Sequence, residues 1–139
     1  MANQTFNRLI NNQLFTRFTW LRFIGFEFWM VGFTPFFIGY VVSSRELYSF
    51  DLFYGFLIIA LLTSSTFVLN HICDIDLDKK NPRKEFSLLV RGTINLRTSW
   101  FLFWILQLTC IMLSFYFNLE FLYCILGLTI ISFVYNVEP

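Results

Sequence analysis

The chain has 139 residues, of which 57% are hydrophobic, 22% are aromatic and only 14% are charged. A soluble globular domain is typically about 45–50% apolar and about 25% charged, and a disordered chain is poorer still in large apolar residues, so the composition excludes both classes. The formal net charge of +1 gives no general electrostatic attraction for nucleic acid. The three cysteines, Cys73, Cys110 and Cys124, form no CxxC or Cys/His cluster and indicate neither a disulfide framework nor a zinc site.

Four apolar stretches have about the length of 18–20 residues that crosses a bilayer. They cover residues 23–42, 52–69, 100–117 and 119–137. The sequence therefore predicts an all-α fold, a polytopic transmembrane helix bundle with four spans, in a single domain over residues 1–139. A short interfacial amphipathic helix is also expected before the first span, because apolar residues between Phe6 and Phe18 recur at three- and four-residue spacing.

The first span is rich in residues that weaken a helix. It contains Gly25, Gly32, Pro35 and Gly39, which a membrane helix tolerates when neighbouring helices cover its backbone. We therefore expect this span to be packed inside the bundle. Glu27 lies near one end of the span and is expected at the membrane interface, with a position facing the bundle interior as the alternative.

Basic residues are distributed unequally around the spans. Nine of the ten Lys and Arg residues precede the first span or lie between the second and third, and only Arg45 lies elsewhere. Cytoplasmic loops of membrane proteins carry an excess of Lys and Arg. We therefore expect a multi-pass integral membrane protein with its amino terminus and its 71–97 loop in the cytoplasm.

The second span ends in a strongly polar segment. Three carboxylates and four cations are crowded into residues 74–84. If the helix continues through this segment, Asn70, Asp74 and Asp78 are spaced by four and share one face, whereas Asp76 points roughly the opposite way. Two carboxylates and an amide oxygen suit a hard cation such as Mg²⁺, which usually completes its shell with water and substrate phosphates. The spacing thus predicts a magnesium site for a phosphate-bearing ligand.

Basic side chains beside this trio provide donors for the same anion. They are Lys79, Lys80, Arg83, Lys84 and Arg91, and an arginine can grip phosphate oxygens with two parallel hydrogen bonds. A simpler interpretation is a solvated positive-inside loop whose lysines offset the dipole of the preceding helix. We interpret His71, the single histidine, as an interfacial residue rather than a ligand or base.

The spacing Asn70-x-x-x-Asp74-x-x-x-Asp78 resembles the first aspartate-rich motif of the UbiA superfamily of intramembrane prenyltransferases. Residues 81–84 and 91–94 resemble the loop that follows that motif. Two positions depart from the family pattern: His71 stands where an aspartate is common, and residues 85–87 replace an Arg-Pro-containing stretch.

The carboxyl-terminal residues show a weaker resemblance. Tyr135 and the residues after it are similar to a Tyr-Ser-x-x-Pro segment that ends the fourth helix of the family. The resemblance extends over nearly the whole chain in helix order, although only the trio and its loop are specific. Family members normally have further spans and a second aspartate-rich motif. We therefore expect this chain to be the amino-terminal half of a larger enzyme, to require that other half as a partner, and to be inactive alone.

The resemblance implies Mg²⁺-dependent transfer of an isoprenoid chain from a prenyl diphosphate to a lipophilic acceptor, in contact with membrane lipid. It implies that Asn70, Asp74 and Asp78 hold the metal, with Asp74 and Asp78 as catalytic residues. Substrate binding is then expected from Asn70, Arg83, Arg91 and Tyr135.

Two other functions fit the same polar segment. One is a non-enzymatic membrane module whose basic loop binds anionic lipid, in which case the number of charges matters and the position of each aspartate does not. The other is the ion entrance of an oligomeric transporter or channel, with the polar run at residues 63–66, below Asn70, as part of the path.

Overall fold

The chain, as a computed structural model, is described over residues 19–44, 49–84 and 87–137. This part is all-helical and contains no strand. Four of its helical segments are long and apolar enough to cross a membrane, namely Phe26–Ser44, Phe50–Cys73, Leu96–Phe117 and Leu119–Val137. The predicted all-α bundle with four spans is thus confirmed. The amphipathic helix predicted before the first span, and Arg45, lie outside the described residues.

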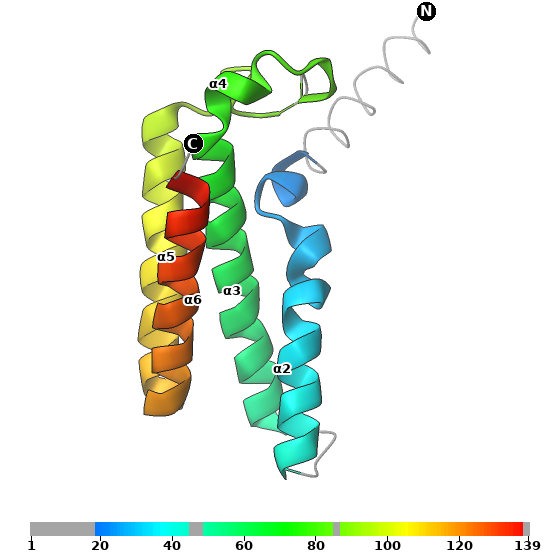
Figure 1. Cartoon of the computed structure of the whole chain (residues 1–139), viewed down its shortest axis with the longest axis vertical. Helices are drawn as coiled ribbons and strands as arrows, with labels where there is room; N and C mark the ends of the chain where they lie inside the picture. The colour runs from blue at the N-terminus through cyan, green and yellow to red at the C-terminus, as the bar shows by residue number, and fades with distance from the viewer. Residues whose placement is uncertain (1–18, 45–48, 85–86, 138–139) are drawn as a thin grey trace, which may run out of the picture.

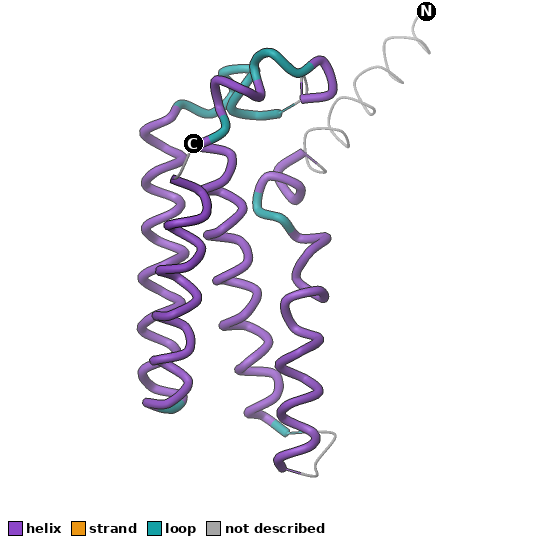
Figure 2. The backbone as a smooth tube through the Cα atoms, in the orientation of Figure 1, coloured by secondary structure: helices purple, strands orange, loops and turns teal. Residues whose placement is uncertain are grey.

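The long helices run alternately up and down the bundle (Figure 1). In chain order the elements are η1 (Phe26–Phe28), α2 (Trp29–Ser44), α3 (Phe50–Cys73), α4 (Ile75–Asp78), η2 (Pro82–Lys84), α5 (Leu96–Phe117) and α6 (Leu119–Val137). Figure 2 shows that α4, η2 and the connection to α5 lie together across one end of the bundle. We call this end the α4 end.

Helix α3 is the centre of the bundle. It packs against α2 on one side and against α5 and α6 on the other (Figure 1). Its start is fixed by Ser49, whose side chain accepts a hydrogen bond of 3.1 Å from the Leu52 amide, and α5 starts in the same way at Asn95. Half of the apolar window of α3 is buried inside the protein, compared with 22% for α5 and 6% for α6.

Helix α2 differs from the expectation of a packed first span. None of its residues is buried, because α3 is its main neighbour and the rest of its surface is left to face the membrane. The contact with α3 is nonetheless close, since a Cβ atom on Gly32 would lie 2.8 Å from Oγ1 of Thr63. Small residues at such a contact let two membrane helices approach each other.

The first span also begins later than predicted. Residues 19–23 are helical, but Gly25 adopts a left-handed conformation (φ 65°) and the regular helix α2 starts only at Trp29. Glycine is suited to this conformation because it has no Cβ atom, and a Cβ here would lie 2.5 Å from the ring of Phe67. The bend places residues 19–24 beside the α4 end of the bundle.

Polar side chains connect the three packed helices α3, α5 and α6. Ser65 Oγ donates a hydrogen bond of 2.8 Å to Gln107 Oε1, and Gln107 Nε2 donates one of 2.7 Å to Thr129 Oγ1. Ser132 Oγ donates one of 3.0 Å to Thr66 Oγ1. In a bilayer there is no hydrophobic force between apolar helices, so such bonds and close packing hold them together.

We expect Gln107→Leu to destabilise the bundle by about 1–2 kcal/mol, because it removes hydrogen bonds to two other helices. The free energy of unfolding can be measured by denaturant titration in mixed micelles. Thr109→Val is the matched control, since Thr109 is an exposed residue on the same helix. Equal stability of the Gln107→Leu and wild-type proteins would contradict this role.

Candidate functional site

The polar segment lies at the α4 end, where the chain leaves α3. Helix α3 ends at Cys73, and Asp74 (φ −84°, ψ 2°) joins it to α4. The uninterrupted helix considered from the sequence is therefore not formed, since a helical ψ is near −42°. The four-residue step is nevertheless kept by backbone hydrogen bonds, from the Asp74 amide to the Asn70 carbonyl (2.9 Å) and from the Asp78 amide to the Asp74 carbonyl (2.8 Å).

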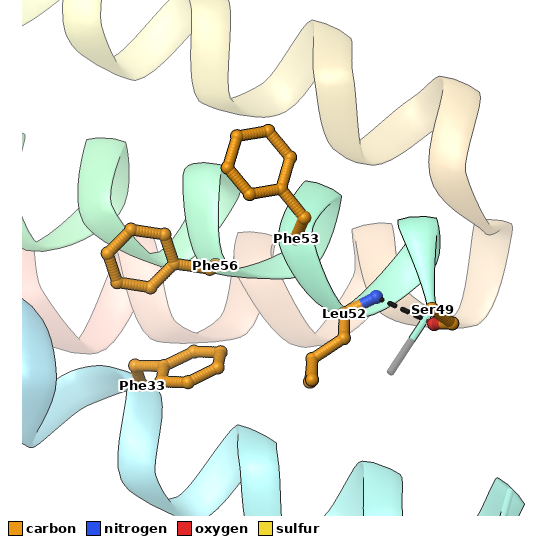
Figure 3. A pocket seen from close by; sticks show the side chains of 5 residues that line it. All are labelled: Phe33, Ser49, Leu52, Phe53 and Phe56. Atoms are coloured by element: carbon orange, nitrogen blue, oxygen red, sulfur yellow. Dashed lines mark hydrogen bonds between the residues drawn. The ribbon is translucent and has the colours of Figure 1, made fainter. Parts of the chain in front are cut away.

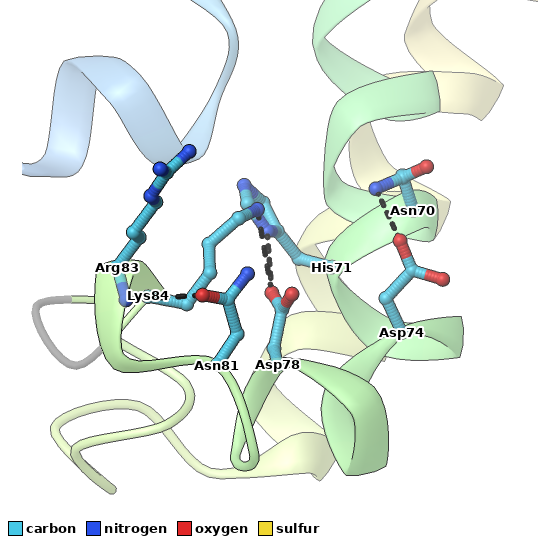
Figure 4. Close-up of polar contacts among 7 residues, drawn as sticks. All are labelled: Asn70, His71, Asp74, Asp78, Asn81, Arg83 and Lys84. Carbon is cyan, nitrogen blue, oxygen red and sulfur yellow. Dashed lines mark hydrogen bonds and ion pairs between the residues drawn. The ribbon is translucent and has the colours of Figure 1, made fainter.

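Asn70 and Asp74 form the first pair in this segment. The Asn70 side-chain amide donates a hydrogen bond of 2.9 Å from Nδ2 to Oδ2 of Asp74 (Figure 4). Both residues are half-buried. The bond aligns the two side chains and leaves the amide oxygen and the second carboxylate oxygen without a hydrogen bond from any described residue.

Asp78 belongs to a second group. It is only 7% exposed, and its Oδ2 atom lies 3.5 Å from Lys84 Nζ and 3.8 Å from His71 Nδ1 (Figure 4). A carboxylate buried this far requires a positive partner. Lys84 provides it, and the pair ties η2 to the end of α4.

His71 lies between Asp78 and the helix before Gly25. Its ring stacks on Phe23 with the ring centroids 5.2 Å apart and the planes 8° from parallel. The 3.8 Å separation from Asp78 is too long for a hydrogen bond, so the buried Nδ1 atom has no hydrogen-bond partner among the described residues. His71 thus lies inside the site, at the end of the candidate span Phe50–Cys73.

These groups border a cavity of about 410 Å³, which we call the polar cavity. Its charged and polar walls are formed by residues from three parts of the chain: Arg22, Glu27, Asn70, His71, Arg83 and Lys84. Its apolar side is formed by Phe23, Phe28, Phe67 and Leu88. Three basic side chains and one carboxylate line this space, and Lys84 is already paired with Asp78. The two arginines are thus the main groups for an anion, and the apolar side suits an anion that also carries an apolar group.

Some of the site residues predicted from the sequence line the polar cavity, and others do not. Asn70 and Arg83 line the polar cavity. Asp74 lies behind this lining, bonded to Asn70. Asp78 also lies behind it, next to His71 and Lys84. Arg91 and Tyr135 are exposed and are not among the residues that line it, and Tyr135 on α6 is 79% exposed.

Asp76 lies apart from both groups. Its side chain is 86% exposed and its Oδ1 atom lies 3.4 Å from Nζ of Lys79. It thus points away from the polar cavity, as the helical spacing indicated.

Three titratable residues of the polar cavity were not assigned to the site from the sequence. Arg22 and Glu27 come from either side of the bend at Gly25, and His71 comes from the motif itself. A glycine between two charged residues at the start of an apolar span is a signal for such a bend. The packing of α2 on α3 determines which part of the cavity wall the residues at the bend form. This packing cannot be read from the sequence.

The donor set fits part of a magnesium shell. Within residues 19–44, 49–84 and 87–137, no three His, Cys, Asp or Glu side chains gather closely enough to enclose a metal ion. Magnesium, however, is commonly bound by one or two carboxylates together with water and substrate phosphates. The aligned oxygens of Asn70 and Asp74 are compatible with that incomplete kind of site.

Comparison with known proteins gives one match. The sequence model of the UbiA prenyltransferase family matches residues 32–138, which include the polar segment and its loop but not Arg22 or Glu27. No curated protein and no solved structure matches the chain.

We expect Lys84→Met to loosen the loop at the α4 end, because it removes the cation nearest to the buried carboxylate of Asp78. Amide hydrogen exchange of residues 79–84 should become about fivefold faster, which corresponds to about 1 kcal/mol for a partly solvated pair. Exchange is measured by mass spectrometry in detergent micelles.

Lys80→Met is the matched control, since Lys80 is exposed on the same loop. Adding Asp78→Asn to Lys84→Met should restore part of the protection, because the buried site then carries no unpaired charge. Unchanged exchange in Lys84→Met would show that this ion pair does not hold the loop.

Proposed function

The chain belongs to the UbiA prenyltransferase family, and from this membership we propose that it takes part in moving an isoprenoid chain from a prenyl diphosphate to a lipophilic acceptor inside the membrane. The observation that carries the proposal is the polar cavity. It combines a cationic wall with an aromatic side at the end of a helix bundle that can span a bilayer. A prenyl diphosphate has the same two-part chemistry.

The basic residues of the polar cavity are proposed to bind the diphosphate. Arg22, Arg83 and Lys84 approach the cavity from two different segments of the chain. Arginine can bind two phosphate oxygens at once, and lysine acts as a compact charge. Held this way, the leaving group is stabilised as negative charge develops on it, and the protein requires no nucleophile of its own.

Asn70 and Asp74 are proposed as the residues that hold Mg²⁺, and Asp78 as a third residue of the same site. When bound, the ion supplies charge stabilisation to phosphate oxygens without a proton transfer. In the structure Asp78 has Lys84 as its positive partner instead. Asp78 thereby positions Lys84 at the wall of the polar cavity, where its ammonium group can contact an anion.

The apolar side of the polar cavity is proposed to hold the first part of the isoprenoid chain. Phe28 and Phe67 lie there with their ring centroids 4.5 Å apart. Such a lining keeps water away from the allylic carbon as its bond to oxygen breaks.

Two further properties belong to this proposal. A diphosphate carries two phosphate groups and the Asn70–Asp74 pair can hold one metal ion, so we propose that another polypeptide segment supplies a second carboxylate cluster.

Because most basic residues lie at the α4 end, we propose that this end faces the cytoplasm.

We expect the full chain in nanodiscs to bind farnesyl diphosphate only when Mg²⁺ is present. Asp74→Asn should weaken this binding by about tenfold or more, because it removes a charged oxygen donor from the metal. Isothermal titration calorimetry gives the dissociation constants with and without Mg²⁺.

Asp76→Asn is the matched control and should bind as the wild type does, since Asp76 is exposed and faces away from the polar cavity. Equal strengthening of diphosphate binding by Asp74→Asn and Asp76→Asn would indicate that only total charge matters, because each substitution removes one negative charge. Binding of anionic lipid by the loop would then replace prenyl transfer as the better proposal. Absence of Mg²⁺-dependent binding in the wild type would overturn the proposed function.

A further inference from the structure

A second cavity lies along α3, toward the amino-terminal end of this helix. It is an open groove of about 510 Å³ between α2 and α3, lined by Phe33, Ser49, Leu52, Phe53 and Phe56 (Figure 3). We call it the apolar groove. Phe56 of this groove and Phe67 of the polar cavity are both on α3, about 16 Å apart along the helix at ~1.5 Å per residue.

Trp29 stands between the two cavities. Its neighbour Phe28 lines the polar cavity, stacked on Phe67. On its other side the Trp29 ring meets Phe56 of the apolar groove edge to face, with the ring centroids 6.3 Å apart. Phe56 in turn meets Phe33 at 4.9 Å. Trp29 thus adjoins residues of both cavities, through its chain neighbour Phe28 on the polar side and through ring contact with Phe56 on the apolar side.

A hydrogen bond fixes the Trp29 side chain in this position. Its Nε1 atom donates to Oγ of Ser64 on α3, at 2.9 Å, and Ser64 is buried. Below this bond the helices are in close contact at Gly32 and Thr63. A large ring tethered to the neighbouring helix cannot turn aside without leaving the indole N–H unpaired in an apolar region.

We propose that Trp29, held by Ser64, determines how long an isoprenoid tail the protein accepts, by closing the polar cavity toward the apolar groove. This inference rests on the proposed function. A short tail fits above Trp29, whereas a longer tail has to pass this ring to reach Phe56 and Phe33. The groove provides only apolar and aromatic contacts beyond the ring, apart from Ser49 at its far end, as an unsaturated hydrocarbon requires.

The test compares the binding of geranyl, farnesyl and geranylgeranyl diphosphate, each with Mg²⁺, to the full chain in nanodiscs. For the wild type, affinity should stop rising with tail length. For Trp29→Ala, the affinity for geranylgeranyl relative to geranyl diphosphate should increase about tenfold or more, because the added carbons can then pack against the aromatic rings of the apolar groove. Ser64→Ala, which frees the ring without removing it, should give a smaller change in the same direction.

Two controls define the outcome. Trp29→Phe retains a ring at the same place and should keep most of the wild-type preference, and Trp104→Ala removes an exposed tryptophan from α5 and should have no effect. Retained binding of geranyl diphosphate by Trp29→Ala shows that the polar cavity is intact.

The possible failures are separate. If the wild type binds all three diphosphates and neither Trp29→Ala nor Ser64→Ala changes their relative affinities, the tail leaves sideways into lipid and the inference is overturned, while the proposed function stands. If the wild type binds none of the three, the proposed function fails and the inference fails with it.

Discussion

The bundle depends on the contacts that α3 makes with its neighbouring helices, because a lipid bilayer provides no hydrophobic force that would bring apolar helices together. Lipid chains are as apolar as leucine, so contact between two helices must come from close packing and from polar bonds between them. Helix α3 provides both: Ser65 donates a hydrogen bond to Gln107 of α5, Thr66 accepts one from Ser132 of α6, and Gly32 of α2 lies close to α3. The polar run below Asn70 is therefore used for packing, since each of its four side chains bonds within the protein, which favours this role over an ion path.

Two interruptions of the helical backbone, at Gly25 and at Asp74, determine the shape of the site at the α4 end. At Gly25 the chain turns, so that Arg22 and Phe23 come over the end of α3. At Asp74 the backbone turns away from the axis of α3, and Asp78 is buried with Lys84 instead of facing the lipid headgroups. Each interruption brings charged side chains to the end of α3, where a straight helix would not place them. The polar cavity lies between them.

The cavity places both kinds of chemistry that an amphiphilic diphosphate requires around the end of α3. Cations and the Asn70–Asp74 pair lie at the α4 end, and aromatic rings continue from Phe67 toward the middle of the bundle. This order follows the direction of the membrane, because charged groups are tolerated near water and aromatic groups in the apolar interior. In the proposed function, affinity for the headgroup and selection of the tail would therefore depend on different residues.

The sequence by itself determined the helical class, the four spans and the place of the polar segment, because membrane thickness and the cost of unpaired backbone leave few alternatives for long apolar stretches. The sequence also indicated Asn70, Asp74 and Asp78 as candidate site residues, because their four-residue spacing can be read without knowledge of the tertiary structure. The tertiary structure alone decided that Asp78 pairs with Lys84, that His71 stacks on Phe23, and that Arg91 and Tyr135 are not among the residues that line the polar cavity. These facts depend on the directions in which α2 and the loop leave their bends, and a side chain's partner across such a bend is set by packing between segments far apart in the chain.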